Sequence, residues 1–561
     1  MRSAIDYPMG YSTTLFMPTS SGIMDDSWRS AYDRGSFFGD ARREASFQWL
    51  SNRIDERQSC VINAITNGDS ERKRAERLLN NAHLDVRAVI ERCCLPVGDN
   101  CLKGEALLNI IDQTTITFAD AVGRQIGQDQ PLGIVGNGFH YGQNCVAGLM
   151  VQKSSLKVLG LSSLSFYSRD EQGTSSRDHR GRDNRPLKYR NPHKWVDAVE
   201  QANFRAIDAR QLIHVIDREG DDMNVLAQIL LSKAEAVNKR ALETHVLIRA
   251  KENRSVHLLT DSSRSGKIRS FLEQVPPVAC YCVEITDDER MSFSATYTGP
   301  SKGRTVKRIR KRKGRRAMLE MRYLSCRMDM AHLKKTKSDM STAHLDELFA
   351  KSDIGHQILT YVHLREVDEK GRPVSLNQNS TGKSSEAVDW LILTTLPVNS
   401  TADALEVVDI YRQRFRLIEQ LFRGLKTDGF NIEVAQQQSV KALQILTAMA
   451  MKGSTLLMKM IGARDQDEGY AIENDFTQRE IEVLQLCLQQ YEGKTNLQAN
   501  PHSATQLSWA VWIIARIGGW KPGNVKRPPG PKTLQRGLEK FYTIYQGVAL
   551  AKEWEPDVSQ P

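Results

Sequence analysis

The stretch YRQRFRLIEQLFRGLK, residues 411–426, is the part of the chain from which the fold is best read. Its apolar residues recur at the three- and four-residue spacing of one helix face, which predicts an amphipathic helix. The other face carries one carboxylate among cations. These residues are Arg412, Arg416, Glu419, Arg423 and Lys426. On a regular helix Arg423 and Lys426 follow Glu419 on the same face, one and two turns further on.

Two interpretations fit this cationic stripe. A solvated helix face with ion pairs between residues four apart is the ordinary one. The other is a metal-binding carboxylate flanked by cations that hold phosphates, as phosphoryl transfer on DNA requires. Matching carboxylates elsewhere in the chain would favour the second interpretation.

Two aspartates elsewhere in the chain come directly after apolar runs. Residues 107–111 are a predicted strand with Asp112 at its polar end, and residues 212–216 are another that ends at Asp217. Either aspartate alone could belong to a turn. Together with Glu419, however, they make a candidate set of three carboxylates.

The stretch at residues 411–426 resembles the Tyr-Arg-Glu-Lys signature of bacterial insertion-sequence transposases of the DDE class, the IS-four family. In that signature two residues separate Tyr from Arg, three separate Arg from Glu, and six separate Glu from Lys. Tyr411 and Arg414 keep the first spacing, and Glu419 and Lys426 keep the last.

The middle spacing departs from the signature, because four residues separate Arg414 from Glu419. A regular helix would put these two side chains about 140° apart. Either a π-bulge restores the register, or Arg416 or Arg412 takes the role of the signature arginine.

Further segments resemble the same family. DQTT, which starts at Asp112, matches its Asp-x-Thr-Thr box. DRE, which starts at Asp217, is followed by an acidic turn and a helix capped by Asp221 or Asp222, as in the family. The fragments FFGDARR and RLLNNAHLD resemble its amino-terminal DNA-end-binding domain.

The resemblance implies an α/β fold with a ribonuclease H-like catalytic core, interrupted by a mostly β insertion domain and flanked by helical N- and C-terminal domains. The predicted elements agree, because they run β–β–β–α–β–α–β before the insertion. The expected boundaries are a flexible arm at 1–26, a helical DNA-end-binding domain at 27–104, the first part of the core at 105–255, the insertion domain at 256–385, the second part of the core with the Glu419 helix at 386–450, and a helical dimerisation domain at 451–561.

The resemblance also implies the site. Asp112, Asp217 and Glu419 would be the catalytic residues and would bind two Mg²⁺ ions, for which Mn²⁺ can substitute. Such carboxylates repel one another without cations, and two metal ions can activate the attacking oxygen and stabilise the leaving one. The residues expected to contact DNA are Tyr411, Arg414, Arg416, Arg423, Lys426, Trp390, Arg249, Arg254, Arg42 and Arg43.

Trp390 opens the predicted strand DWLILTT, and its distance from Tyr411 resembles that in the Tn-five group of the family. In that group the tryptophan stacks on a flipped base during hairpin formation. A core tryptophan at the start of a strand is the alternative. The basic run KGRTVKRIRKRKGRR, residues 302–316, is likewise either a solvated loop or a set of phosphate contacts.

Composition is consistent with a globular protein that binds a polyanion. The net charge of +10 favours such a partner. The nine cysteines show no metal-binding spacing and are expected to be reduced. The apolar stretch 442–463 is interrupted by Lys452 and Lys459, so a buried helix is expected there, and no contact with a membrane. No signal peptide is evident, and we expect a bacterial cytoplasmic protein, associated with the nucleoid when bound to DNA.

The function implied is cut-and-paste transposition. The partners would be double-stranded DNA, namely the terminal inverted repeats of the element and the target, and a second copy of the chain in a homodimeric synaptic complex. The steps would be nicking, hairpin formation, hairpin opening and strand transfer. The alternatives are a nuclease on the same fold and a domesticated DNA-binding protein. The second should have lost an acid, and none is missing.

Overall fold

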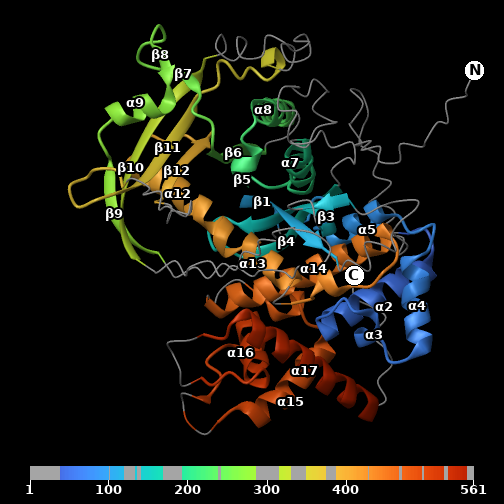
Figure 1. Ribbon diagram of the computed structural model, residues 1–561. Coiled ribbons are helices and arrows are strands. Elements are labelled where there is room, and N and C mark those ends of the chain that lie inside the picture. The colour runs from blue at the N-terminus through green and yellow to red at the C-terminus, as the bar shows by residue number, and fades with distance from the viewer. Residues whose placement is uncertain are drawn as a thin grey trace, which may run out of the picture.

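The computed structural model describes residues 38–99, 102–118, 133–135, 140–167, 193–237, 242–285, 315–329, 349–374, 387–426, 429–465, 470–493, 495, 498–522 and 528–552. They form a mixed α/β protein in which twelve of the described strands make one sheet. Figure 1 shows this sheet with helices on both of its faces and further helices at the two ends of the chain. The predicted flexible arm at 1–26 lies outside the described residues.

The described part of the predicted N-terminal domain is helical, as expected. It contains α2 (Ala41–Arg57), α3 (Ile62–Ile65), α4 (Asp69–Leu79) and α5 (Val86–Cys93). Helix α2 begins where the Asp40 side chain accepts a hydrogen bond from the Arg42 amide at 2.8 Å. Its buried residues Phe47, Leu50 and Ile54 recur at helical spacing and face the core.

The first half of the sheet follows the predicted order of elements, with a short strand and a 3₁₀ turn added. Its elements are β1 (Ala106–Thr117), β2 (Gly133–Val135), β3 (His140–Gln152), β4 (Val158–Tyr167), α7 (His193–Arg205), β5 (Gln211–Ile216), η3 (Arg218–Gly220), α8 (Met223–Val237) and β6 (Glu243–Ala250). Strand β1 pairs antiparallel with β3 and parallel with β5, and β5 pairs parallel with β6. The central strand β5 reads as a continuous buried run because helices cover both of its faces.

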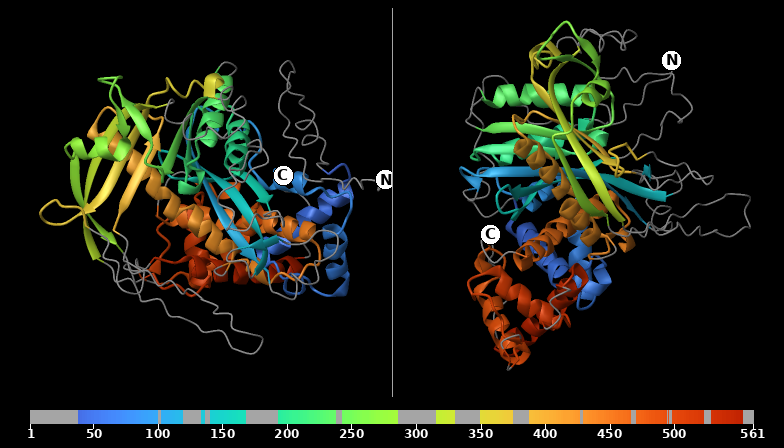
Figure 2. Two further views of the ribbon diagram at one scale, coloured as in Figure 1. Left: turned by 45° about the horizontal axis from the view of Figure 1, so that its top comes forward. Right: turned by 90° about the vertical axis from the view of Figure 1, so that its left-hand side faces the viewer.

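The strands of the predicted insertion extend the same sheet. They are β7 (Ser255–Leu258), β8 (Ser265–Lys267), β9 (Ala279–Ile285), β10 (Arg315–Met328) and β11 (Leu359–Val367), with helix α9 (Ile268–Gln274) between β8 and β9. Strand β12 (Asp389–Thr394) lies between β6 and β11 and pairs antiparallel with both. The views in Figure 2 place these strands at the end of the molecule opposite the N-terminal helices.

The predicted helix over 411–426 is two helices in the structure. Helix α12 (Thr401–Arg416) starts with a capping box between Ser400 and Asp403, and α13 (Ile418–Leu425) follows after a break at Leu417. The backbone of Leu417, with φ −110° and ψ −73°, ends one helix and starts the next. The expectation of one uninterrupted helix is therefore wrong at this residue.

The remaining elements are helical, as predicted. They are η4 (Ile432–Val434), α14 (Val440–Asp465), η5 (Ile472–Asn474), α15 (Gln478–Tyr491), α16 (Leu507–Ile517) and α17 (Pro531–Ala551). Helix α14 is largely buried against the N-terminal helices and the sheet. In the part of the chain that the structure describes, no helix has the length and apolar character needed to cross a membrane.

Two apolar cores lie on the two faces of the sheet. One lies beneath α12, α13, α14 and the N-terminal helices, and the other beneath α7 and α8. Side chains of a strand alternate between the two faces, and neighbouring apolar residues of β1 and β5 therefore face different cores. Ile110 and Val215 belong to the first core, and Ile111 and Ile216 belong to the second.

Candidate active site

Asp112 and Asp217 stand side by side on neighbouring strands. The parallel ladder between β1 and β5 ends at the pair Ile111–Ile216, and the two aspartates are the next residues along. They follow the alternation of Ile110 and Val215 and so face the helices α12 and α13. Strand β1 itself continues past Asp112 to Thr117 along β3. Asp112 instead marks the place where β1 and β5 cease to pair.

Arg414 joins the two aspartates to Glu419. Its Nη2 lies 2.9 Å from Asp112 Oδ2 and 3.2 Å from Asp217 Oδ2, and its Nη1 lies 3.6 Å from Glu419 Oε1. The Arg414 side chain is buried, with 6% of the residue exposed. One guanidinium therefore contacts a carboxylate of β1, a carboxylate directly after β5 and a carboxylate of α13.

The break at Leu417 explains how Arg414 meets Glu419 despite the extra residue between them. The turn between α12 and α13 absorbs that residue, because the backbone of Leu417 departs from the regular helical dihedrals. The break takes the place of the expected π-bulge. Arg416 is exposed, and Arg412 is exposed and pairs with Asp409 at 3.3 Å. Of the three candidate arginines, Arg414 is the one that contacts the acids.

Tyr411 lies one turn before Arg414 on α12 and supports Asp217. Its hydroxyl donates a hydrogen bond to Asp217 Oδ1 at 3.0 Å. Burial, together with the negative charge of Asp217, raises the pKa of the Tyr411 phenol well above its usual range. The phenol therefore keeps its proton and acts as a donor.

Burial shifts the pKa values of the groups in this acid cluster. It raises the pKa of Asp112 to about 6, against the opposing effect of Arg414. Asp112 Oδ1 also accepts a hydrogen bond from the Gln113 amide at 2.8 Å. Burial alone would lower the pKa of Arg414, but the charges of Asp112 and Asp217 outweigh it and raise that pKa. The guanidinium is thus permanently charged, and the carboxylates depend on it.

The three acids suit a divalent metal ion by their donor chemistry, because carboxylate oxygens are preferred ligands of Mg²⁺. Arg414 supplies the compensating positive charge in this arrangement. Within the described ranges, no three His, Cys, Asp or Glu side chains are grouped as a ready metal site. No model of a known protein family matches the chain.

Trp390 lies next to these residues, at the start of β12. Its ring stacks on Phe415 with centroids 5.6 Å apart and an angle of 20° between the planes. It meets the Tyr411 ring edge-on at 5.4 Å, and Tyr411 also packs against Phe415. Trp390 is only partly buried. The ring thus belongs to a packed aromatic cluster and still reaches the surface beside the acids.

Arg249 and Arg254 differ in their placement. Arg249 follows Ile248, which pairs with Ile216, so it stands beside Asp217 on the same face of the sheet. Arg254 is 8% exposed and forms an ion pair with Asp221 at 2.5 Å. The predicted contact of Arg254 with DNA does not fit this burial, because its charge already has a buried partner.

The Asp221 side chain holds a loop and does not cap α8. Its Oδ2 accepts hydrogen bonds from the amides of Lys251 at 2.7 Å and Glu252 at 3.0 Å. Asp222 accepts from the Asn224 amide at 2.7 Å and takes the capping role at α8. Asp221 and Arg254 thereby tie the turn after Asp217 to the end of β6.

The other predicted cations lie in different surroundings. Lys426 donates from Nζ to the Thr115 carbonyl on β1 at 2.6 Å, and burial lowers its pKa. Arg423 is exposed on α13. Arg42 and Arg43 lie at the start of α2, where Arg43 donates to the His83 carbonyl at 3.0 Å. Of the basic run 302–316, all but the last two residues lie outside the described residues.

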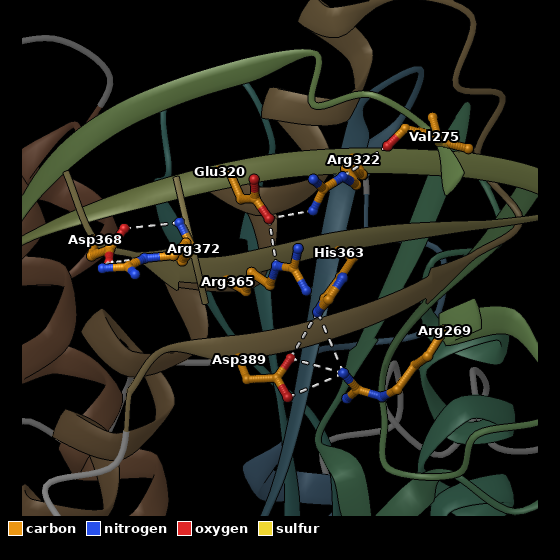
Figure 3. A network of polar contacts seen from close by, with 9 residues as sticks. All are labelled: Arg269, Val275, Glu320, Arg322, His363, Arg365, Asp368, Arg372 and Asp389. Carbon is orange, nitrogen blue, oxygen red and sulfur yellow. Dashed lines mark hydrogen bonds and ion pairs between the residues drawn. The ribbon is translucent and has the colours of Figure 1, made fainter. Parts of the chain in front are cut away.

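A polar network behind Trp390 has no counterpart among the sequence predictions (Figure 3). Asp389 accepts a hydrogen bond from His363 Nε2 at 2.8 Å, and both its oxygens lie 3.1 Å from Arg269 Nη1. Burial would raise the pKa of Asp389, but these two partners lower it to about 2. Asp389 alternates with Trp390 along β12, so the network lies on the opposite face of the sheet. It joins the start of β12 to β11 and α9.

A second group of ion pairs lies near the first one (Figure 3). Glu320 on β10 pairs with both Arg322 and Arg365, and Arg322 also donates to the Val275 carbonyl at 2.8 Å. Glu320 and Arg322 are buried. The sequence shows charged residues that alternate along β10 and β11, but which of them pair depends on the register between the two strands.

Proposed function

We propose that the chain is a DDE transposase with a ribonuclease H-like core, which cuts double-stranded DNA at the ends of an insertion sequence and joins those ends to target DNA. The observation that carries this proposal is the convergence of Asp112, Asp217 and Glu419 on one guanidinium. These acids are far apart in the sequence, at positions 112, 217 and 419. A random set of surface acids would not meet at one buried point.

The arrangement of the strands supports the ribonuclease H-like core. Strands β4, β3, β1, β5 and β6 lie in this order, with β1 parallel to β5 and β5 parallel to β6. Asp112 lies on the first strand of the predicted order, and Asp217 directly follows the fourth. The third acid comes from helix α13, which contacts β1.

The chain's own residues suit phosphodiester chemistry. When bound by the three carboxylates, two Mg²⁺ ions would activate the attacking oxygen and stabilise the leaving oxygen. Tyr411 holds the Asp217 carboxylate by its hydroxyl, and Lys426 holds the part of β1 just beyond Asp112. The exposed Arg416 and Arg423 are available to DNA phosphates, which supply affinity independent of sequence.

The partly exposed ring of Trp390 supports a hairpin step. A base extruded from the duplex can stack on an aromatic side chain, and Trp390 lies beside Tyr411 at the acid cluster. The proposed partners are therefore the terminal inverted repeats and the target DNA, together with a second copy of the chain in the synaptic complex. Such a protein would work in the bacterial cytoplasm, on the nucleoid.

Isosteric changes of the three acids test the proposal. Asp112→Asn, Asp217→Asn and Glu419→Gln should each abolish Mg²⁺-dependent cleavage of the element's end DNA while gel-shift binding persists. Asp409→Asn is the matched control, because Asp409 is an exposed carboxylate on α12 that pairs with Arg412. Substantial cleavage by any of the three acid variants would remove that residue from the site.

The same assay separates transposition from the nuclease alternative. A transposase should release ends with a free 3′-OH and join them to a second, unrelated DNA molecule. A nuclease on this fold would cleave without forming joined products. Cleavage without any strand transfer would therefore favour the nuclease.

A further inference from the structure

Arg414 occupies the centre of the acid cluster. Its Nη2 is within hydrogen-bond distance of both Asp112 and Asp217, and its Nη1 is the atom that lies near Glu419. Each carboxylate belongs to a different element of the chain. A single side chain therefore balances charge that three elements bring together.

The guanidinium and a divalent cation would need the same carboxylate oxygens. The position between Asp112 and Asp217 can hold one cation at a time, because two positive groups there would repel each other. An arginine does not lose its proton in proteins, so it cannot leave by becoming neutral. It can vacate the site only by moving.

The surroundings of Arg414 are incompletely satisfied in this arrangement. Its Nε is buried and has no hydrogen-bond partner among the residues that the structure describes. A buried donor without a partner costs free energy. The side chain also lies three residues before the break at Leu417, near the end of α12. A different position, with all of its donors used, would therefore compete well with this one.

We propose that Arg414 is an exchangeable internal counter-cation, which holds the acid cluster in the DNA-free chain, gives way to a divalent metal ion and then binds a DNA phosphate. This inference rests on the proposed metal-dependent function and adds a coupling to it. A phosphate accepts two parallel hydrogen bonds from a guanidinium, so it can replace the carboxylates as a partner.

The exchange couples the two ligands. DNA draws Arg414 away from the carboxylates and so raises their affinity for metal. By thermodynamic linkage the metal must raise the affinity for DNA by the same factor. A chain without the guanidinium should bind metal more tightly, and DNA should no longer affect that binding.

Mn²⁺ binding to the full chain tests this directly, with free Mn²⁺ followed by its electron paramagnetic resonance signal. Arg414→Gln should bind Mn²⁺ on the order of tenfold more tightly than the wild type. Arg412→Gln is the matched control: it removes the same charge two residues away on α12, from an exposed arginine that pairs with Asp409. Its Mn²⁺ affinity should stay at the wild-type value.

Duplex DNA provides the second arm of the experiment, with Mn²⁺ bound by DNA alone subtracted. It should raise the Mn²⁺ affinity of the wild type and of Arg412→Gln, and leave that of Arg414→Gln unchanged. Arg414→Lys keeps the charge but loses the fork that reaches three carboxylates. It should fall between wild type and Arg414→Gln, and it carries the test if the glutamine variant does not fold.

Two outcomes separate this inference from the proposed function. If Asp112→Asn loses Mn²⁺ binding while Arg414→Gln binds it no better than the wild type, the exchange is wrong and the metal site stands. If Asp112→Asn and Asp217→Asn both keep full Mn²⁺ binding, the proposed metal site itself is wrong. Tighter, DNA-independent binding by Arg414→Gln supports the exchange.

Discussion

At the scale of single residues, the site depends on which side chains contact the same carboxylate. Tyr411 and Arg414 both contact Asp217, the first through a hydroxyl and the second through a guanidinium. Arg416, two residues beyond Arg414, reaches solvent instead. Neighbouring arginines of one helix thus have different roles because of the direction in which each side chain leaves the helix.

The Tyr411→Phe variant should separate the effect of the hydrogen bond to Asp217 from the effect of ring packing. The ring keeps its contacts with Trp390 and Phe415, and only the hydrogen bond to Asp217 is removed. We expect stability to change by about 1 kcal/mol or less, and cleavage to fall by about 10–100-fold, as for other residues that orient metal-binding groups. Melting temperatures and cleavage rates would be compared with those of Tyr470→Phe, which loses a hydroxyl that accepts from the Val158 amide. Unchanged cleavage in Tyr411→Phe would show that the hydroxyl has no part in the reaction.

Trp390→Ala tests the base-stacking role. If the ring mainly fills the core, the change should cost about 3–5 kcal/mol of stability and impair all steps alike. If the ring receives a flipped base, about 1–3 kcal/mol is lost only where a base is extruded. We expect nicking to survive and hairpin formation to fall, with partial recovery in Trp390→Phe. Rates on intact and pre-nicked end DNA, measured beside the melting temperature, decide between the two. Equal losses in both reactions together with a lower melting temperature would exclude stacking.

At the scale of elements, the start of β12 is held from both faces of the sheet. Trp390 packs on α12 on one face, and Asp389 binds His363 of β11 and Arg269 of α9 on the other. The position of Trp390 therefore depends on contacts that do not touch it. The break at Leu417 has a comparable effect on α13, because it orients the helix that carries Glu419.

Asp389→Asn should remove an acid-sensitive part of the stability. His363, Arg269 and the cross-strand neighbour Arg365 face this carboxylate, and its pKa in the folded chain is about 2. The unfolded value is about 3.9. Because the folded pKa is the lower one, the contribution is present above pH 4 and is lost as the pH falls from about 4 to about 2. Denaturant titrations across this range should show a smaller decline in the variant. Identical declines in the two chains would argue against the network.

At the scale of the whole molecule, one sheet joins the predicted core to the predicted insertion. Strand β12 pairs with β6 on one side and with β11 on the other, so the two regions share backbone hydrogen bonds. The N- and C-terminal helices also meet: the Gln546 side chain of α17 donates to Glu56 at 2.8 Å and accepts from Arg57 at 3.3 Å, both on α2. Helices from opposite ends of the sequence are therefore held together by hydrogen bonds.

The basic run 302–316 affects the charge of the whole molecule, because it contributes to the net charge of +10. Lys307→Gln, Arg308→Gln and Arg310→Gln, made together, should weaken binding to all DNA sequences alike. Removing one cation that binds a DNA phosphate should reduce the log–log salt slope by about 0.9. Affinities measured over a range of salt concentrations, on end DNA and unrelated DNA, would show this. A slope equal to that of the wild type would mean that the run is a solvated loop.

The sequence alone determined the features that depend on local patterns. Apolar runs followed by an acid located β5, which ends just before Asp217, and the first half of β1, because continuous apolar runs are typical of strands covered on both faces. Helical spacing predicted a helix over residues 411–426, which covers α13 and the end of α12, and the resemblance to a transposase signature gave Arg414 as one of three candidates. The three acids stand out together from sequence patterns alone, without knowledge of their partners.

Only the tertiary structure decided which of those residues meet. In the folded chain Arg414 contacts the acids, and the helix predicted over 411–426 is interrupted at Leu417. Arg254 is buried against Asp221, and Asp389 pairs with His363 on the face of the sheet opposite Trp390. The three ion-pair arrangements leave no local pattern, because each depends on a partner that is distant in the sequence. A charge exposed to water gains little from such a partner, whereas a buried charge requires one. These partners come together only in the folded chain, so the sequence pattern around each residue does not identify them.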